Sequence, residues 1–171
     1  MKETSSIQEK PLIFGTITGA ALSLLLVIKY FADIYFVASF IDVLEIIIPI
    51  ICLRMLIKKY PFTANPPSWL EMVKLGTRVM FFSAILTSFT IYLFCTFDSS
   101  FLRAYIDTLI NSMTYFEDFF GQMGVSKEEF NNLTPMTLFL SHLMEYVLSG
   151  FFLSVLVATY YRLSAFIRYK Q

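Results

Sequence analysis

The chain reads MTLFLSHLMEYVLSGFFLSVLVATY from residue 136 to residue 160. Most of these residues are apolar, and about 20 such residues cross the hydrocarbon core of a bilayer as a helix. Three further stretches of the same kind lie at residues 11–32, 36–57 and 72–97. The pattern predicts an all-α integral membrane protein, a four-helix bundle that forms a single membrane domain over residues 1–171.

The composition supports a membrane protein. Of the 171 residues, 57% are hydrophobic and only 15% are charged, whereas soluble domains carry about 25% charged residues. So few charges cannot coat a soluble globule. The net charge is zero and no basic cluster carries interleaved aromatic residues, so we expect no nucleic-acid partner.

The basic residues are distributed unevenly between the two sides of the predicted bundle. If the N-terminus is cytoplasmic, the inner basic residues are Lys2, Lys10, Arg54, Lys58, Lys59, Lys74, Arg78, Arg162, Arg168 and Lys170. The outer ones are Lys29, Arg103 and Lys127. This bias follows the positive-inside rule and predicts that both termini are cytoplasmic. The first apolar run is too long for the core of a signal peptide, so we expect an uncleaved first span.

Residues 98–135, between the third and fourth spans, predict an extracytoplasmic amphipathic helical hairpin. Its first helix, over residues 101–123, has an apolar face made of Leu102, Tyr105, Ile106, Leu109, Met113, Phe116, Phe120 and Met123. Its polar face carries Arg103, Asp107, Asn111, Thr114, Glu117 and Asp118. Ser126 and Glu129 form a capping box that predicts a second, short helix. Helices that lie on a bilayer are usually basic on the polar face, so we expect this acidic one to pack over the bundle or against a partner.

Small residues predict where the helices pack closely. Gly15 and Gly19 form a G-x-x-x-G pattern in the first span, Gly76 lies in the third, and Gly150 and Ser154 lie in the fourth. Small side chains at helical spacing let two helix backbones approach each other. We favour packing within the chain, with homodimerisation as the alternative.

The third span begins with a helix-capping signal. Ser68 and Glu71 have the spacing of a capping box, in which the Ser hydroxyl accepts from a backbone N–H and the Glu carboxylate accepts in return. Trp69, the single tryptophan, falls at the predicted membrane interface.

Four ionisable residues lie inside the predicted spans. Asp42 and Glu45 share a face of the second span, and His142 and Glu145 share a face of the fourth. Both helices run from outside to inside, and each pair begins about 9 Å below its helix start at 1.5 Å per residue. The pairs therefore lie at matching depth. Because a charge that faces lipid is costly, we expect these groups to face the bundle interior.

Pro49 adds a backbone acceptor to this region. Proline has no N–H for the carbonyl four residues earlier, which is that of Glu45. We therefore expect a kink and an unpaired carbonyl oxygen beside the carboxylates.

Three interpretations of the polar residues stay open. In the first, His142 and Lys29 satisfy the acids in a hydrogen-bond cluster that is only structural. In the second, the cluster binds a proton, an ion or a lipid head group, as intramembrane ionisable residues often do. The third is a metal site, although di-metal bundles use Glu-x-x-His and this chain has His142-x-x-Glu145 with a single His. Motifs for nucleophilic catalysis or nucleotide binding are missing from the sequence, so we expect no catalytic residues, cofactor or metal.

The order of these features is similar to that of a known family. The shared features are Phe14-Gly15-x-x-x-Gly19, Trp69-x-x-x-Val73-Lys74-x-Gly76, the outer insertion before Pro135 and a fourth span ending in Arg162. On these features the chain resembles the domain of unknown function 4199 family of small four-span bacterial membrane proteins. The resemblance implies the fold and a bacterial inner (cytoplasmic) membrane location, and it supplies no catalytic residues. Similar proteins are often encoded near membrane glycosyltransferases acting on polyprenyl phosphate, which implies an accessory role.

These observations favour a non-enzymatic accessory subunit that binds another membrane protein or a lipid head group. The alternative is a small proton- or ion-coupled carrier built around the intramembrane polar residues. The chain has no internal inverted repeat, which argues against a carrier that acts as a monomer. An enzyme acting on lipid-linked substrates is a third possibility, and a homo-oligomer stays open.

Overall fold

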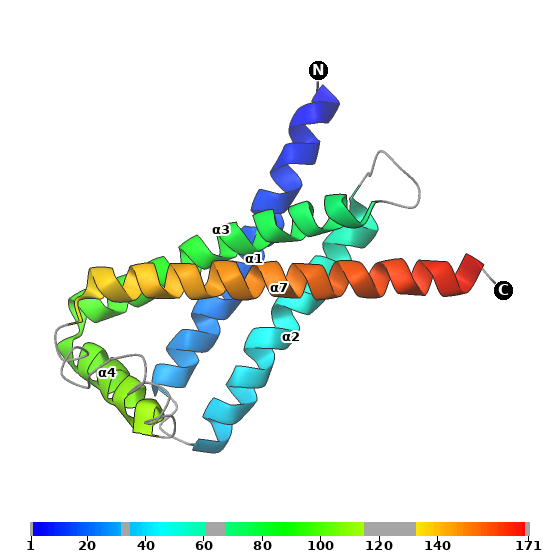
Figure 1. Cartoon of the computed structure of the whole chain (residues 1–171). Helices are drawn as coiled ribbons and strands as arrows, with labels where there is room; N and C mark the ends of the chain where they lie inside the picture. Colours follow the sequence, from blue (N-terminus) through cyan, green and yellow to red (C-terminus); the bar gives the residue numbers. More distant parts are fainter. Residues whose placement is uncertain (1, 32–34, 61–67, 115–132, 170–171) are drawn as a thin grey trace. The chain divides into compact units, whose positions relative to one another are not determined.

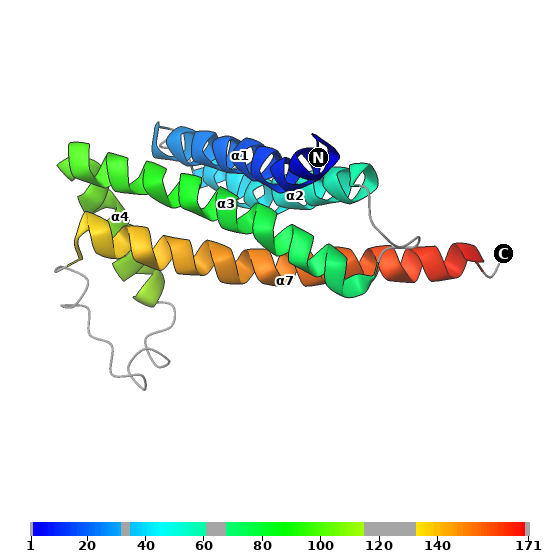
Figure 2. The same ribbon diagram turned by 90° about the horizontal axis from the view of Figure 1, so that it is seen from above.

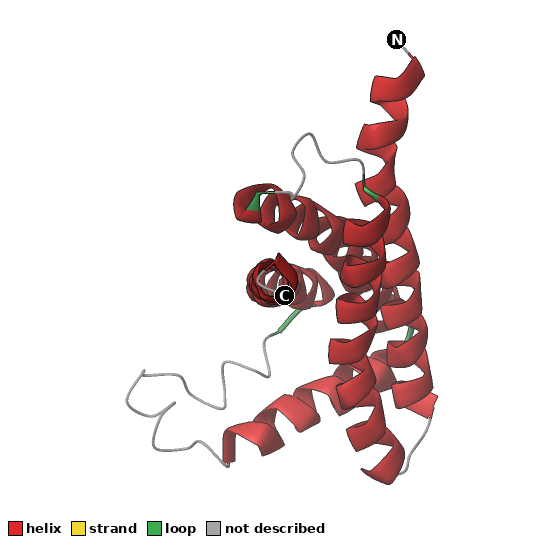
Figure 3. Ribbon diagram, turned by 90° about the vertical axis from the view of Figure 1, so that its right-hand side faces the viewer, coloured by secondary structure: helices red, strands yellow, loops and turns green. Residues whose placement is uncertain are grey.

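The computed structural model describes residues 2–31, 35–60, 68–114 and 133–169, and its regular elements there are all helices (Figure 3). In chain order they are α1 (Lys2–Phe31), α2 (Tyr35–Lys59), α3 (Trp69–Phe97), α4 (Ser99–Thr114) and α7 (Pro135–Tyr169) (Figure 1). The predicted all-α class is confirmed.

Three of these helices are long and apolar enough to cross a membrane. Over the described residues the candidate spans are Glu9–Lys29, Trp69–Phe97 and Pro135–Ser164. They coincide with the first, third and fourth predicted spans. The helix α2 is not among them, and it carries Asp42, Glu45 and Arg54 within its length. Its position as the second of four spans stays a prediction.

The chain divides into two compact units. The first comprises Met1–Thr87 and Leu143–Gln171, and the second comprises Ser88–His142. The helices α3 and α7 continue without a break through both units. The interpretation of residues 1–171 as one membrane domain stays a prediction.

In the first unit, α1 packs against α3 through its two glycines. A Cβ atom placed on Gly15 would lie 2.6 Å from the Cβ of Phe82 and 2.7 Å from the carbonyl oxygen of Val79. At Gly19 the corresponding atom would lie 3.0 Å from the carbonyl oxygen of Ser83. The G-x-x-x-G pattern therefore serves close packing within the chain.

The helices α3 and α7 lie side by side and run in opposite directions (Figures 1 and 2). A Cβ on Gly76 of α3 would lie 2.6 Å from the hydroxyl of Ser154 on α7. Gly150 of α7 faces the side chain of Met80 in the same way. Glycines on both helices thus allow the two backbones to approach.

Apolar side chains from these helices form two clusters in the first unit. The larger cluster contains Leu53, Leu56, Ile57, Met72, Val73, Leu75, Val79, Met80, Val157 and Ala158. The smaller contains Leu22, Leu25 and Ile41, with Leu44, Ile48 and Tyr146 packed against it. Side chains of both α2 and α7 take part in each of these clusters.

The basic helix ends gather at one end of the first unit. The Lys10 ammonium donates to the Lys59 carbonyl at 3.2 Å, which joins the start of α1 to the end of α2. The Trp69 indole N–H donates to the Thr159 hydroxyl at 3.1 Å, which joins the start of α3 to the last third of α7. The larger apolar cluster joins the end of α2 to the start of α3.

The predicted capping box at the start of α3 is confirmed. The Glu71 backbone N–H donates to the Ser68 hydroxyl at 3.2 Å. In return, the Ser68 backbone N–H donates to the Glu71 carboxylate at 3.0 Å. These bonds satisfy two of the N–H groups that a helix start leaves without internal partners.

The second unit holds the end of α3, all of α4 and the start of α7. The rings of Tyr92 and Phe139 join α3 to α7 with centroids 6.2 Å apart. The Asp98 carboxylate accepts the Ser100 backbone N–H at 2.9 Å and caps α4. On α4, Phe101 and Ile106 are buried, whereas Arg103 and Asp107 are exposed. The second arm of the predicted hairpin lies outside the described residues, so the hairpin stays a prediction.

Candidate functional site: an acidic cluster around Lys29

The first unit places one lysine among three carboxylates. The Lys29 ammonium, in the last turn of α1, lies 2.5 Å from a carboxylate oxygen of Asp42 on α2. Both side chains are partly open, with 41% of Lys29 and 58% of Asp42 exposed. The sequence named Lys29 as a possible partner of the acids, and the structure supplies this pair.

Two further carboxylates complete this group. Glu45 interacts electrostatically with Lys29, Asp42 and Glu145. Glu145 of α7 also interacts with Lys29. We call Lys29, Asp42, Glu45 and Glu145 the acidic cluster. Three helices of the first unit, α1, α2 and α7, contribute to it.

The charges of the acidic cluster do not balance. Among these four described groups there are one ammonium and three carboxylates, so their summed formal charge is −2 when all of them are ionised. Ionised side chains in a membrane pair with one another or mark a site of function, because a lone charge in hydrocarbon is costly. A proton, a cation or a basic group of a partner would complete the balance.

The expected interior orientation is wrong for two members of the cluster. Asp42 and Glu145 are exposed, whereas Glu45 is half-buried. Residue spacing fixes the position of a side chain along its helix, but the rotation of α2 and of α7 about their axes depends on packing. The Ile and Leu residues of α2 surround the helix, so the sequence gives little information about that rotation.

His142 has a different neighbour from the one expected. Its Nε2 is hydrogen-bonded to the hydroxyl of Tyr105 on α4, and the two rings meet edge to face with centroids 5.4 Å apart. Both residues belong to the second unit, whereas the acidic cluster belongs to the first. A single site that combines His142 with Asp42, Glu45 and Glu145 stays a prediction.

Tyr105 was not singled out as a functional residue in the sequence. It lies on the apolar face of the predicted outer helix, where its ring suggests a packing role. The sequence did indicate a hydrogen bond at this position, since the hydroxyl of a tyrosine on an apolar helix face usually finds a partner when the ring is buried.

The backbone carbonyls of Glu45 and Glu145 have different donors. Pro49 is buried within α2, and its missing N–H leaves the Glu45 carbonyl without the usual helical donor. On α7 the Glu145 carbonyl accepts the Ser149 hydroxyl at 2.5 Å. Within the described part of the chain, no three His, Cys, Asp or Glu side chains are arranged to hold a metal ion.

Comparison with known proteins gives the family. Residues 13–162 match the family model described as "Protein of unknown function (DUF4199)". The chain belongs to this DUF4199 family. The resemblance read from the sequence is confirmed, and all four acidic cluster residues of this DUF4199 protein fall inside the matched region. No curated protein and no solved structure matches the chain.

Proposed function

We propose that this DUF4199 protein is a non-enzymatic accessory subunit of a complex in the bacterial inner membrane. In this proposal α2 is the fourth membrane span, both termini are cytoplasmic, and the acidic cluster lies in the outer leaflet. The cluster binds a partner membrane protein that supplies a basic or hydrogen-bond-donating side chain. A membrane glycosyltransferase acting on polyprenyl phosphate is the candidate partner that the family resemblance implies.

The observation that supports this proposal is the combination of unbalanced charge and exposure. Asp42 and Glu145 are exposed, and the four described groups of the cluster sum to a formal charge of −2 when all of them are ionised. In water this arrangement would cost little, because solvent screens exposed charges. In a bilayer these exposed charges need a polar or oppositely charged group to shield them from the acyl chains. Next to Asp42 on α2, the exposed apolar side chains of Val43, Ile46 and Ile47 extend the same surface. A partner helix that covers this surface satisfies both requirements.

Affinity purification in a mild detergent tests this proposal. We expect the wild-type chain to retain a stoichiometric membrane-protein partner, and Asp42→Asn with Glu145→Gln to weaken that association about tenfold or more. Removing one side of a buried charged contact costs about 2–5 kcal/mol, and 1.4 kcal/mol corresponds to tenfold. Asp107→Asn is the matched control, since Asp107 is an exposed acid on α4, outside the cluster.

Three results decide the test. Loss of the partner in the double variant but not in Asp107→Asn supports the proposal. Equal retention by all variants contradicts it. A wild-type chain that purifies alone or only with copies of itself also contradicts it and favours the second candidate.

The second candidate is a small proton- or ion-coupled carrier. Pro49 favours it, because its missing N–H removes the usual helical donor to the carbonyl of Glu45, a residue of the acidic cluster. Unwound or unpaired carbonyls next to carboxylates are typical of coupling-ion sites in transporters. Proteoliposomes with an imposed ion or proton gradient test this candidate: flux that disappears in Glu45→Gln supports it, and flux equal to that of empty liposomes contradicts it.

A further inference from the structure

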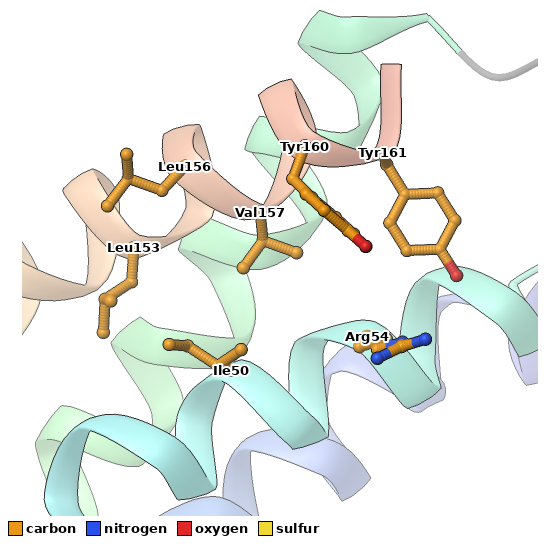
Figure 4. Close-up of a pocket in the computed structure, with 7 residues that line it drawn as sticks. All are labelled: Ile50, Arg54, Leu153, Leu156, Val157, Tyr160 and Tyr161. Carbon is orange, nitrogen blue, oxygen red and sulfur yellow. The ribbon is translucent and has the colours of Figure 1, made fainter. Parts of the chain in front are cut away.

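A groove separates α2 from α7 in the first unit, away from the acidic cluster. It has a volume of about 330 Å³. Figure 4 shows Ile50 and Arg54 on α2 across from Leu153, Tyr160 and Tyr161 on α7, and Leu156 also lines the groove. This volume lies near the lower end of the range of about 300–1,000 Å³ that is typical of small-molecule sites.

The two ends of the groove differ chemically. Ile50, Leu153 and Leu156 line one end with aliphatic carbon, and Leu156 is 65% exposed. Arg54, Tyr160 and Tyr161 line the other end, and Figure 4 shows the tyrosine rings extending from α7 toward α2 near the guanidinium. The groove is therefore amphipathic along its length, as a lipid is.

Arg54 is available for an anion. Within the described part of the chain, no carboxylate lies within ion-pair distance of its guanidinium, and the side chain is exposed. A guanidinium presents a planar set of N–H donors that matches two oxygens of a phosphate group. A tyrosine hydroxyl near it can donate to a third oxygen.

The depth of Arg54 also fits a phosphate. Arg54 lies about 7 Å along α2 from Lys59 at 1.5 Å per residue. The head-group region on each side of a bilayer is about 5–8 Å thick. With the end of α2 at the cytoplasmic surface, Arg54 is level with the border between head groups and acyl chains, where tyrosine rings are also favoured.

We propose that this groove binds one anionic phospholipid of the cytoplasmic leaflet. The phosphate lies on Arg54 and the tyrosine hydroxyls, and one acyl chain lies along Ile50, Leu153 and Leu156. An anionic head group is favoured over a zwitterionic one because the exposed Arg54 guanidinium would repel a choline. The site requires that α2 crosses the membrane, but it does not depend on a protein partner at the acidic cluster.

Native mass spectrometry of the full chain in detergent tests this proposal. The probes are phosphatidylglycerol and phosphatidylcholine with identical acyl chains. We expect the wild type to retain phosphatidylglycerol about tenfold more strongly than phosphatidylcholine, and Arg54→Gln to remove that preference. Lys58→Gln is the matched control, since it removes a basic charge one turn away on the same helix but does not line the groove.

A second variant tests the apolar end. Leu156→Trp fills the groove without changing its charge, and the exposure of Leu156 allows the larger ring to fit. We expect it to lower phosphatidylglycerol retention several-fold while the chain still elutes as a folded species. Bound lipid stabilises the folded state, so added phosphatidylglycerol should raise the Tm of the wild type but not that of Arg54→Gln.

The outcomes separate clearly. Equal weakening by Arg54→Gln and Lys58→Gln means diffuse attraction to a basic surface and overturns the proposal. Equal retention of the two lipids also overturns it. The wild-type chain could instead retain no lipid but bind a second membrane protein in a way that needs Arg54. That result would assign the groove to a protein helix and overturn the lipid site. None of these results affects the partner test on Asp42 and Glu145.

Discussion

Gly15→Ala should weaken the contact between α1 and α3. The added Cβ would lie 2.6 Å from the Cβ of Phe82 and 2.7 Å from the carbonyl oxygen of Val79, whereas carbon atoms pack best at about 3.5–4.0 Å. Neither neighbour can rotate away, because one atom is a Cβ and the other belongs to the backbone. The α1 helix must therefore move about 1 Å from α3, and a gap of that size forfeits about a quarter to a half of the dispersion energy of each contact.

The expected loss of stability follows from this overlap. Overpacking of this kind costs about 1–3 kcal/mol, and we expect the upper half of that range for Gly15→Ala. In a chain of this size, 1 kcal/mol shifts the Tm by about 2–4 °C, so the Tm should fall by about 4–12 °C. Gly19→Ala should cost less, about 1 kcal/mol, because its nearest neighbours lie 3.0 Å from the new atom.

Thermal unfolding in detergent, followed by loss of the monodisperse peak, measures these differences. Ala20→Val is the control, since Ala20 is exposed and exposed substitutions usually change stability by less than about 0.5 kcal/mol. If Gly15→Ala unfolds at the same temperature as Ala20→Val, the packing argument is refuted. If Gly15→Ala instead removes a cross-linked dimer and leaves the Tm unchanged, the G-x-x-x-G face is a dimer interface.

Three further predictions concern individual contacts. Ser68→Ala removes the cap of α3 and should cost about 1 kcal/mol, seen as a Tm lower by about 2–4 °C; an unchanged Tm would exclude a stabilising role for this cap. Lys29→Met leaves the carboxylates without their cation and should lower the yield of membrane-inserted protein, with partial recovery when Asp42→Asn is added. Equal yields from the single and double variants would show that the pair does not matter for insertion. Tyr105→Phe removes the hydroxyl that meets His142 and should cost about 1 kcal/mol; a double-mutant cycle with His142→Gln checks this, and strict additivity of the two changes would contradict a direct interaction.

The sequence predicted the local features of the fold well. The capping box formed by Ser68 and Glu71 depends on residues three positions apart, so the information needed to find it is local. The small residues Gly15 and Gly76 marked faces where backbones approach closely. Their spacing did not say which helix would fill each face, because a glycine permits contact with any neighbour of suitable shape.

The candidate site was predicted less completely. The constant rise of a helix predicted a matching depth for Asp42, Glu45 and Glu145, and Glu45 lies close enough to the other two for an electrostatic interaction. Their exposure did not follow, because the rotation of α2 and of α7 about their axes is decided by packing. Arg54 appeared only as a positive charge on the inner side, and its groove with Tyr160 and Tyr161 needs contacts between helices that are far apart in the sequence.

The orientation of α2 in the membrane tests the central claim most directly. In a background of Cys52→Ser and Cys95→Ala, which replaces the two free cysteines, Tyr35→Cys and Lys59→Cys place a single thiol at either end of α2. We predict that a membrane-impermeant maleimide labels residue 35 in intact spheroplasts and labels residue 59 only after the membrane is permeabilised. Labelling of both residues from the same side would show that α2 does not cross the bilayer, and would contradict the four-span bundle with an acidic cluster in its outer leaflet.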